Sequence, residues 1–210
     1  YFNYDILTPT PFLIACHINS IKTISCQERP LSSVWCDLLI FDHYFVGGPG
    51  FQEKLIKRGH CIGKYYSVGL PRSSYINECG NGNYSKQFGI MKNQQLLVCF
   101  DITHMTHFGV GLGSDTISIE TLTEFYNSLY ELSTKFNNIF VLIKPKDIKI
   151  FNNPKFSIYL NSKQSNFKVI TDIKKYNPYD VASAADIVIG KQTSILEESF
   201  SAGKKVIYYD

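Results

Sequence analysis

The chain has 210 residues, and 21 lysines and arginines against 18 aspartates and glutamates give it a formal net charge of +3. This small excess excludes a strongly basic nucleic-acid-binding protein and an acidic, solvating chain. Hydrophobic residues make up 44% and charged residues 19%, which is typical of a globular protein with a substantial core. The best candidate for a membrane span, Pro11–Ile18, is far shorter than the roughly 20 residues that cross a bilayer and is predicted to be a buried strand.

The first 76 residues predict strands separated by one helix. We expect strands at Phe12–Ile18, Ile21–Cys26, Leu38–Phe41 and Tyr66–Val68, and a helix at Gln52–Arg58. The segment Asn77–Gln95 is rich in Asn, Gly, Lys and Gln, which predicts a linker or a surface insertion.

From Leu96 onward, short apolar runs alternate with helical patterns. Apolar residues in Ser118–Phe136 recur at spacings of three and four, which marks one face of a helix. The predicted strands are Leu96–Phe100, Ile139–Ile143, Phe167–Ile170, Ile187–Ile189 and Val206–Tyr209, and the other helices are Asn153–Ser162, Pro178–Ala184 and Ser194–Ala202. Strands that are apolar on both faces and separated by helices predict a parallel sheet covered on both sides.

The predicted architecture is therefore α/β with two Rossmann-like domains. Residues 1–76 form a partial first domain, residues 77–95 a linker or insertion, and residues 96–210 a second domain that is nearly complete. We expect the chain to be a piece of a longer enzyme, because the first domain has about half of the strands that such a domain needs.

The six cysteines give no metal or redox motif. None is spaced as C-x-x-C, which argues against zinc-ribbon and thioredoxin-type sites. Most of them lie in apolar segments, where a free cysteine behaves as a small hydrophobic residue. We predict reduced thiols in a cytoplasmic protein.

The segment Ala185–Asp210 carries the strongest functional signal: a strand, a tight turn, a helix and another strand. Thr193 and Ser194 lie where the helix begins, and Ser194-x-x-Glu197 fits a capping box. A helix start after a parallel strand is an anion site, and ligands of open α/β sheets bind at that edge. The alternative is structural, because any such unit needs a capped helix and a glycine stop.

This segment resembles the last βαβ unit of the nucleotide-binding domain in GT-B-type glycosyltransferases. In those families a Ser/Thr-rich turn is followed by a Glu five residues before a Gly, a spacing that Glu198 and Gly203 match. The resemblance implies that Thr193 and Ser194 hold the donor diphosphate and that Glu198 binds the nucleotide ribose.

Phe41–Arg72 resembles the end of the first domain in the glycerophosphotransferases of teichoic acid synthesis and in capsule-type transferases. Both show an apolar strand that enters a Gly-containing turn, and then a Gly-x-Pro-Arg, here Gly69 to Arg72. The resemblance implies that Arg72 lies near the cleft between the domains, where an Arg fork suits phosphate. The alternative for Arg72 is an ordinary surface residue after a proline turn.

Two histidines of the glycerophosphotransferases are missing. The corresponding strands end here in Gln27-Glu28-Arg29-Pro30 and in Lys144-Pro145-Lys146-Asp147. Glu28 is a candidate general base toward an acceptor hydroxyl, or else a solvated loop carboxylate. Lys144 is a candidate for offsetting phosphate charge in place of a metal, or else a surface lysine.

The loop Asp101–Asp115 carries His104, His107, Gly109 and Gly111. Its Gly-x-Gly-x-Gly pattern suggests a loop that approaches a phosphate, but it does not match the dinucleotide fingerprint. The two histidines have no third metal-type partner in sequence, so we predict no metal site and favour a His-bearing loop over the cleft. The absence of Asp-x-Asp disfavours a metal-dependent GT-A transferase.

We therefore predict a metal-independent, GT-B-like glycosyltransferase of bacterial surface polysaccharide or capsule biosynthesis. It would transfer a sugar or polyol phosphate from a UDP-, CDP- or CMP-linked donor to a saccharide or lipid-linked acceptor, with no tightly bound cofactor and no nucleic acid partner. Its expected location is the cytoplasm, with peripheral association with the inner face of the membrane left open. The alternatives are a non-hydrolysing sugar-nucleotide 2-epimerase and a non-catalytic nucleotide-binding module.

Overall fold

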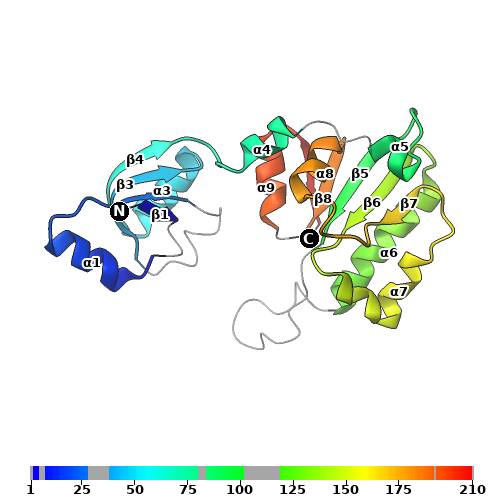
Figure 1. The fold of residues 1–210 in the computed structure, drawn as a ribbon, viewed down its shortest axis with the longest axis horizontal. Coiled ribbons are helices and arrows are strands. Elements are labelled where there is room, and N and C mark those ends of the chain that lie inside the picture. The colour runs from blue at the N-terminus through cyan, green and yellow to red at the C-terminus, as the bar shows by residue number, and fades with distance from the viewer. Residues whose placement is uncertain are drawn as a thin grey trace. The chain divides into compact units, whose positions relative to one another are not determined.

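The computed structural model describes residues 2–4, 8–27, 38–79, 84–101, 119–191 and 193–209. The chain divides into two compact units, Tyr1–Ser74 and Tyr75–Asp210 (Figure 1). Each unit contains its own parallel sheet and is described by itself below.

The first unit contains a four-stranded parallel sheet with the order β1-β2-β3-β4. Its elements are β1 (Phe2–Tyr4), α1 (Thr10–Ile18), β2 (Ile24–Cys26), β3 (Ile40–Val46), α3 (Pro49–Lys57) and β4 (Cys61–Ser67), and α4 (Ser73–Glu78) begins at its end. The strand predicted at Phe12–Ile18 is wrong, because this run forms helix α1. Leu13 and Cys16, one turn apart, are the buried residues of that helix.

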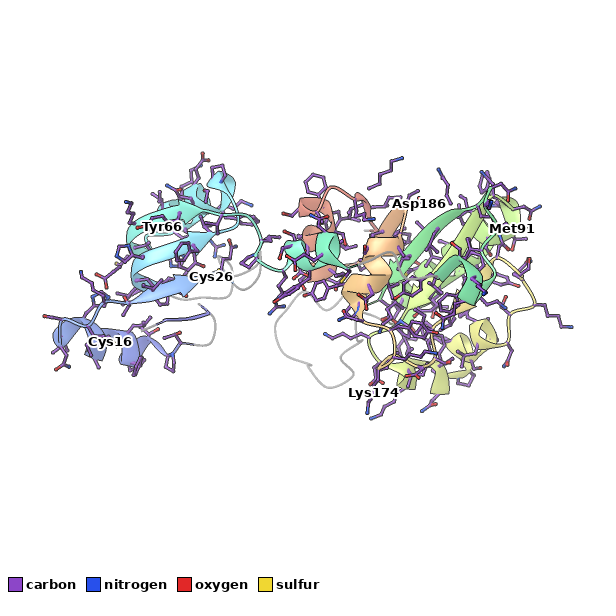
Figure 2. All side chains as sticks on the ribbon, turned by 45° about the horizontal axis from the view of Figure 1, so that its top comes forward. Cys16, Cys26, Tyr66, Met91, Lys174 and Asp186 are labelled. Carbon is purple, nitrogen blue, oxygen red and sulfur yellow. The ribbon has the colours of Figure 1, made fainter. Side chains whose placement is uncertain are left out.

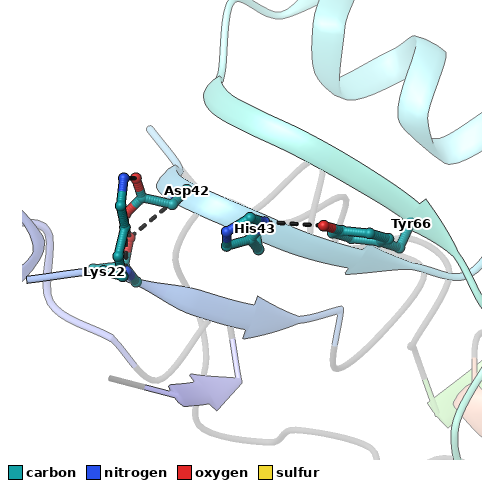
Figure 3. Close-up of polar contacts among 5 residues, drawn as sticks. Lys22, Asp42, His43 and Tyr66 are labelled. Carbon is teal, nitrogen blue, oxygen red and sulfur yellow. Dashed lines mark hydrogen bonds and ion pairs between the residues drawn. The ribbon is translucent and has the colours of Figure 1, made fainter.

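Strand β3 is longer than predicted and holds two polar contacts of the first unit. The Asp42 carboxylate accepts hydrogen bonds from the Lys22 ammonium at 2.8 Å and from the Thr23 N–H at 2.9 Å (Figure 3). These bonds, led by the one from Lys22, hold the pKa of Asp42 well below its ordinary value. On the same strand, His43 Nδ1 lies 3.1 Å from the Tyr66 hydroxyl of β4. The Gly-containing turn expected after Phe41 therefore begins only at Gly47.

The second unit contains a five-stranded parallel sheet with the order β7-β6-β5-β8-β9. Its elements are α5 (Tyr84–Phe88), β5 (Gln95–Phe100), α6 (Ile119–Lys135), β6 (Ile139–Lys144), the 3₁₀ helix η3 (Ile148–Asn152), α7 (Pro154–Leu160), β7 (Phe167–Val169), α8 (Pro178–Ala184), β8 (Ile187–Gly190), α9 (Ser194–Ser201) and β9 (Lys205–Tyr208). These confirm every strand and helix that the sequence predicts after residue 95, to within a few residues at each end.

Helices cover both faces of this sheet. Helices α6 and α7 lie on one face, and α8 and α9 lie on the other (Figure 1). Val98 and Leu142 pack toward α8 and α9, whereas their neighbours Cys99 and Ile143 pack toward α6 and α7. Burial on both faces explains why these strands are continuous apolar runs.

The composition of the segment 77–95 predicts a linker or a surface insertion, and its described residues include packed apolar side chains. It contains helix α5 and belongs to the second unit. Tyr84 is buried in the core on the α8 and α9 face, and Phe88 and Ile90 pack against that core. A few apolar side chains at helical spacing are therefore sufficient to anchor a segment that is otherwise polar.

Two polar side chains form hydrogen bonds between elements that are far apart in the sequence. Asp186 Oδ2 accepts a hydrogen bond from the Leu96 N–H at 2.7 Å, so the Ala-Asp pair before β8 fixes the start of β5. Asn166 Nδ2 donates to the Ser133 and Ile139 carbonyl oxygens, both at 2.8 Å, which ties the end of α6 to β6.

The five cysteines within the described residues are free thiols, among them Cys16 in α1 and Cys26 in β2 (Figure 2). None of the helices in the described ranges has the length and apolar character that crossing a membrane requires.

Candidate functional site

The carboxyl edge of the second sheet brings three charged residues together. Lys144 ends β6, Asp101 follows β5, and Lys191 follows β8. Phe100 of β5 pairs with Lys144 on one side and with Gly190 on the other, so the three charged positions are neighbours across the strand ends. All three are buried, with exposed fractions of 5% for Asp101, 7% for Lys144 and 5% for Lys191.

This edge is also the switch point of the sheet. From β5 the chain crosses to β6 and β7 on one side, and it later returns to β8 and β9 on the other side. Crossovers in opposite directions leave a crevice outside the carboxyl ends of the two central strands, where open α/β sheets bind ligands. Here those strands are β5 and β8, so Asp101, Lys191 and the start of α9 border the crevice.

The turn from β8 into α9 depends on Gly190. A Cβ atom at this position would lie 2.5 Å from the Phe100 carbonyl oxygen, a distance that real Cβ atoms do not adopt. The glycine therefore lets β8 pair with β5 up to the strand end. Thr193 then caps α9 in an extended conformation, with φ −123° and ψ 136°, and Ser194 is the first helical residue.

The predicted capping box is wrong by one residue. A capping box needs Ser194 at the N-cap, but Thr193 occupies that position and its side chain makes no capping hydrogen bond. Glu197 consequently does not reach back to the helix start. Its Oε2 atom is buried without a hydrogen-bond partner among the described residues, and burial raises the pKa of its carboxyl.

Glu198 lies one residue further along α9 and is only 4% exposed. This burial holds the side chain in place instead of letting it range through solvent. A held carboxylate near the start of a helix suits recognition of hydroxyl groups, because it accepts hydrogen bonds without further ordering. The ribose-binding role of Glu198 stays a prediction.

Asp101 is the most strongly bonded group at this edge. Its Oδ2 accepts a hydrogen bond from the Tyr126 hydroxyl of α6 at 2.7 Å, and its Oδ1 accepts one from the Lys146 N–H at 2.6 Å. Burial raises the pKa of Asp101 to about 6, although both hydrogen bonds and the charges of Lys144 and Lys146 lower it. The carboxylate therefore fixes the chain just after β6, and its charge changes close to neutral pH.

The two buried lysines differ in their surroundings. Burial lowers the pKa of Lys144, and the negative charge of Asp101 opposes that effect. The Lys191 ammonium instead lies 4.9 Å from the centre of the Tyr209 ring, on the residue that follows β9. Tyr209 is itself held by its N–H, which donates to the Gly190 carbonyl oxygen at 2.9 Å.

The other predicted site residues stay predictions. Arg72 belongs to the first unit, where it is half-buried in the turn before α4. The remaining predicted residues lie outside the described ranges; they are Glu28, His104, His107, Gly109 and Gly111. Within the described ranges, no group of three or more His, Cys, Asp or Glu side chains could hold a metal ion.

The sequence predicted Lys144, Thr193, Ser194 and Glu198 as site residues and did not single out Asp101 and Lys191, which lie at the same edge. A signal for both was present, since each is a charged residue that directly follows an apolar strand. In a parallel sheet such positions meet at one edge, whatever their separation in the sequence.

Two Rossmann-like parallel sheets, the second with a helix start at its switch point, define a GT-B-type α/β protein. Among solved structures, the chain is similar to S. aureus MnaA in complex with UDP, with a TM-score of 0.58 and 10% identity over 94% of this chain and 53% of MnaA. MnaA has a GT-B-like fold, which confirms the predicted fold class.

A structure of the wall teichoic acid polymerase TagF also matches, with a TM-score of 0.47 and 12% identity over 80% of this chain and 39% of TagF. The chain thus spans about half of MnaA and two fifths of TagF. No protein-family model matches the sequence, and no curated protein matches it.

Proposed function

We propose that the second unit binds the nucleotide part of a nucleotide-activated sugar or polyol donor, and that the whole enzyme transfers the activated group to a saccharide or lipid-linked acceptor. The observation that supports this most is the carboxyl edge of the second sheet. There the start of α9 and the buried Lys191 border the crevice between β5 and β8, the buried Lys144 ends the neighbouring strand β6, and α9 carries the buried carboxylate of Glu198.

Each group has a distinct part in this proposal. The backbone N–H groups and hydroxyls at Thr193 and Ser194 bind phosphate oxygens, since a helix N-terminus favours anions. Lys144 adds positive charge in place of a metal ion, and Glu198 accepts hydrogen bonds from the ribose hydroxyls. Arg72 binds phosphate, and Glu28 serves the acceptor side as the general base that takes the proton of the attacking hydroxyl.

The test measures nucleotide binding by the parent chain and by Glu198→Ala, using isothermal titration with UDP, CDP, GDP and CMP. We expect one diphosphate nucleotide to bind the parent and Glu198→Ala to weaken it by about tenfold or more, since a hydrogen bond to a charged group is worth about 1.5–3 kcal/mol. Glu131→Gln, on the exposed face of α6, is the matched control and should leave binding unchanged. Equal binding by the parent and Glu198→Ala contradicts the role of Glu198.

The second candidate is a non-hydrolysing sugar-nucleotide 2-epimerase, which the similarity to MnaA favours, because MnaA is a UDP-GlcNAc 2-epimerase whose structure contains UDP. An epimerase needs no acceptor, whereas a transferase does. Analysis of products with and without an added acceptor separates the two activities. A third outcome, binding without turnover under either condition, supports a non-catalytic nucleotide-binding module.

A further inference from the structure

Lys144 and Lys191 are the two buried lysines within the described part of the chain, and they are not equivalent. The charge of Asp101 acts on Lys144 and partly compensates it. No carboxylate of the described residues pairs with Lys191, whose ammonium contacts the face of the Tyr209 ring. Burial of a charge without a counter-ion is costly, and a ring face offsets only part of that cost.

The position of Lys191 indicates what compensates its charge. It directly follows β8 and lies two residues before Thr193, the N-cap of the eight-residue helix α9. The partial positive charge of the helix start and the ammonium therefore belong to the same strand-to-helix turn. Two positive groups in one strand-to-helix turn favour an anion beside that turn and disfavour a cation.

We propose that Lys191 binds the phosphate groups of the ligand and makes the site prefer a diphosphate to a monophosphate. The inference rests on the proposed function, because it concerns the same crevice. The start of α9 satisfies the oxygens of one phosphate, and a second, linked phosphate brings oxygens to an ammonium that forms no ion pair with a carboxylate of the described residues. The Lys191 ammonium lies over the Tyr209 ring. The position of that ring is fixed by the hydrogen bond from the Tyr209 N–H to the Gly190 carbonyl oxygen and by packing on Phe125, with 4.5 Å between the ring centres.

The test uses Lys191→Met, which keeps the shape of the stem and removes the charge. The control is Lys205→Met, an exposed lysine at the amino end of β9, at the opposite edge of the sheet. Both variants and the parent are titrated with UDP, CDP and GDP, with the matching monophosphates and with inorganic pyrophosphate. We expect Lys191→Met to lose about tenfold or more in affinity for the diphosphates, as is typical of a charge-assisted hydrogen bond, and less for the monophosphates. Lys205→Met should bind as the parent does.

A third variant, Lys191→Arg, separates charge from packing, because it keeps the positive charge. It should retain most of the affinity that Lys191→Met loses, and an equal loss in both variants overturns the inference. Thermal unfolding of all variants shows whether each is folded.

The outcomes also distinguish the two proposals. If nucleotides bind Lys191→Met as tightly as the parent, Lys191 is not a ligand residue, although the proposed function stands. If the parent binds pyrophosphate through Lys191 but binds no nucleotide, the inference stands and the proposed function fails. If the parent binds neither, both fail.

Discussion

Replacing Asp101 with asparagine removes a buried group that changes charge close to neutral pH. Burial raises the pKa of Asp101 to about 6 in the folded chain, against an ordinary value of 3.8. A carboxyl whose pKa is raised on folding adds stability below its unfolded pKa, and that stability is lost as the pH rises through the folded pKa. The relevant window therefore runs from about pH 4 to about pH 6, with the loss complete just above it.

The magnitude follows from these two pKa values. Across the whole window the shift of about 2 pKa units corresponds to about 3 kcal/mol, of which about 1.4 kcal/mol falls between about pH 5 and about pH 7.5. Asparagine keeps one acceptor for the Tyr126 hydroxyl or the Lys146 N–H and has no charge to lose. Over this pH interval, the free energy of unfolding of Asp101→Asn should therefore fall by about 1.4 kcal/mol less than that of the parent.

The assay is urea unfolding of the parent and Asp101→Asn at several pH values between these limits, with unfolding measured by circular dichroism. Glu131→Gln is the control, because the Glu131 side chain is 66% exposed and carries a surface ion pair with Lys135. It should follow the parent at every pH. Parallel curves for the parent and Asp101→Asn refute the account of Asp101 as a buried group that protonates near pH 6.

Three further substitutions test the packing of the same unit by thermal and urea unfolding. Asn166→Ala should cost about 1–3 kcal/mol, because it leaves buried carbonyl oxygens at the end of α6 without a donor; a change within error contradicts that role. Gly190→Ala should lower the free energy of unfolding by about 1–3 kcal/mol or more, since its Cβ would meet the Phe100 carbonyl oxygen. The Cβ of the control variant, Gly50→Ala, meets no atom within 4 Å, so this variant should be tolerated. Lys191→Met should unfold at a higher temperature than the ligand-free parent, because it removes a buried charge that forms no ion pair with a carboxylate of the described residues, and a lower temperature argues that Lys191 has a structural role instead.

The second unit was predictable because its strands are buried on both faces. Continuous apolar runs such as Leu96–Phe100, separated by helices with a spacing of three and four, allow few arrangements other than a parallel sheet. The glycines at positions 190 and 203 also mark a turn and a helix end, and Gly203 adopts the positive φ that such an end requires.

The errors have equally local causes. The run Phe12–Ile18 is apolar and short, so periodicity alone does not separate a strand from a helix. Helix α1 leaves Phe12 and Ile18 exposed, which is why no amphipathic pattern is visible there. The capping box at Ser194 failed because either Thr193 or Ser194 can cap a helix, and the chain uses the first.

The site was only half predictable for a physical reason. Motifs identify residues that are close in sequence, such as Thr193 and Glu198. Asp101 and Lys191 are 90 positions apart and become neighbours only through the register of β5 and β8. Burial of a charge, which makes Lys191 informative, is likewise a property of the folded chain.

The central claim is that phosphate binds at the turn from β8 into α9. It is tested most directly by a crystal structure of the chain with the nucleotide that binds most tightly in the titrations. The account predicts phosphate density at the start of α9, within hydrogen-bond distance of Ser194 and the Lys191 ammonium, with a ribose hydroxyl on Glu198. Nucleotide density elsewhere in the second unit, with the crevice between β5 and β8 empty, would contradict it.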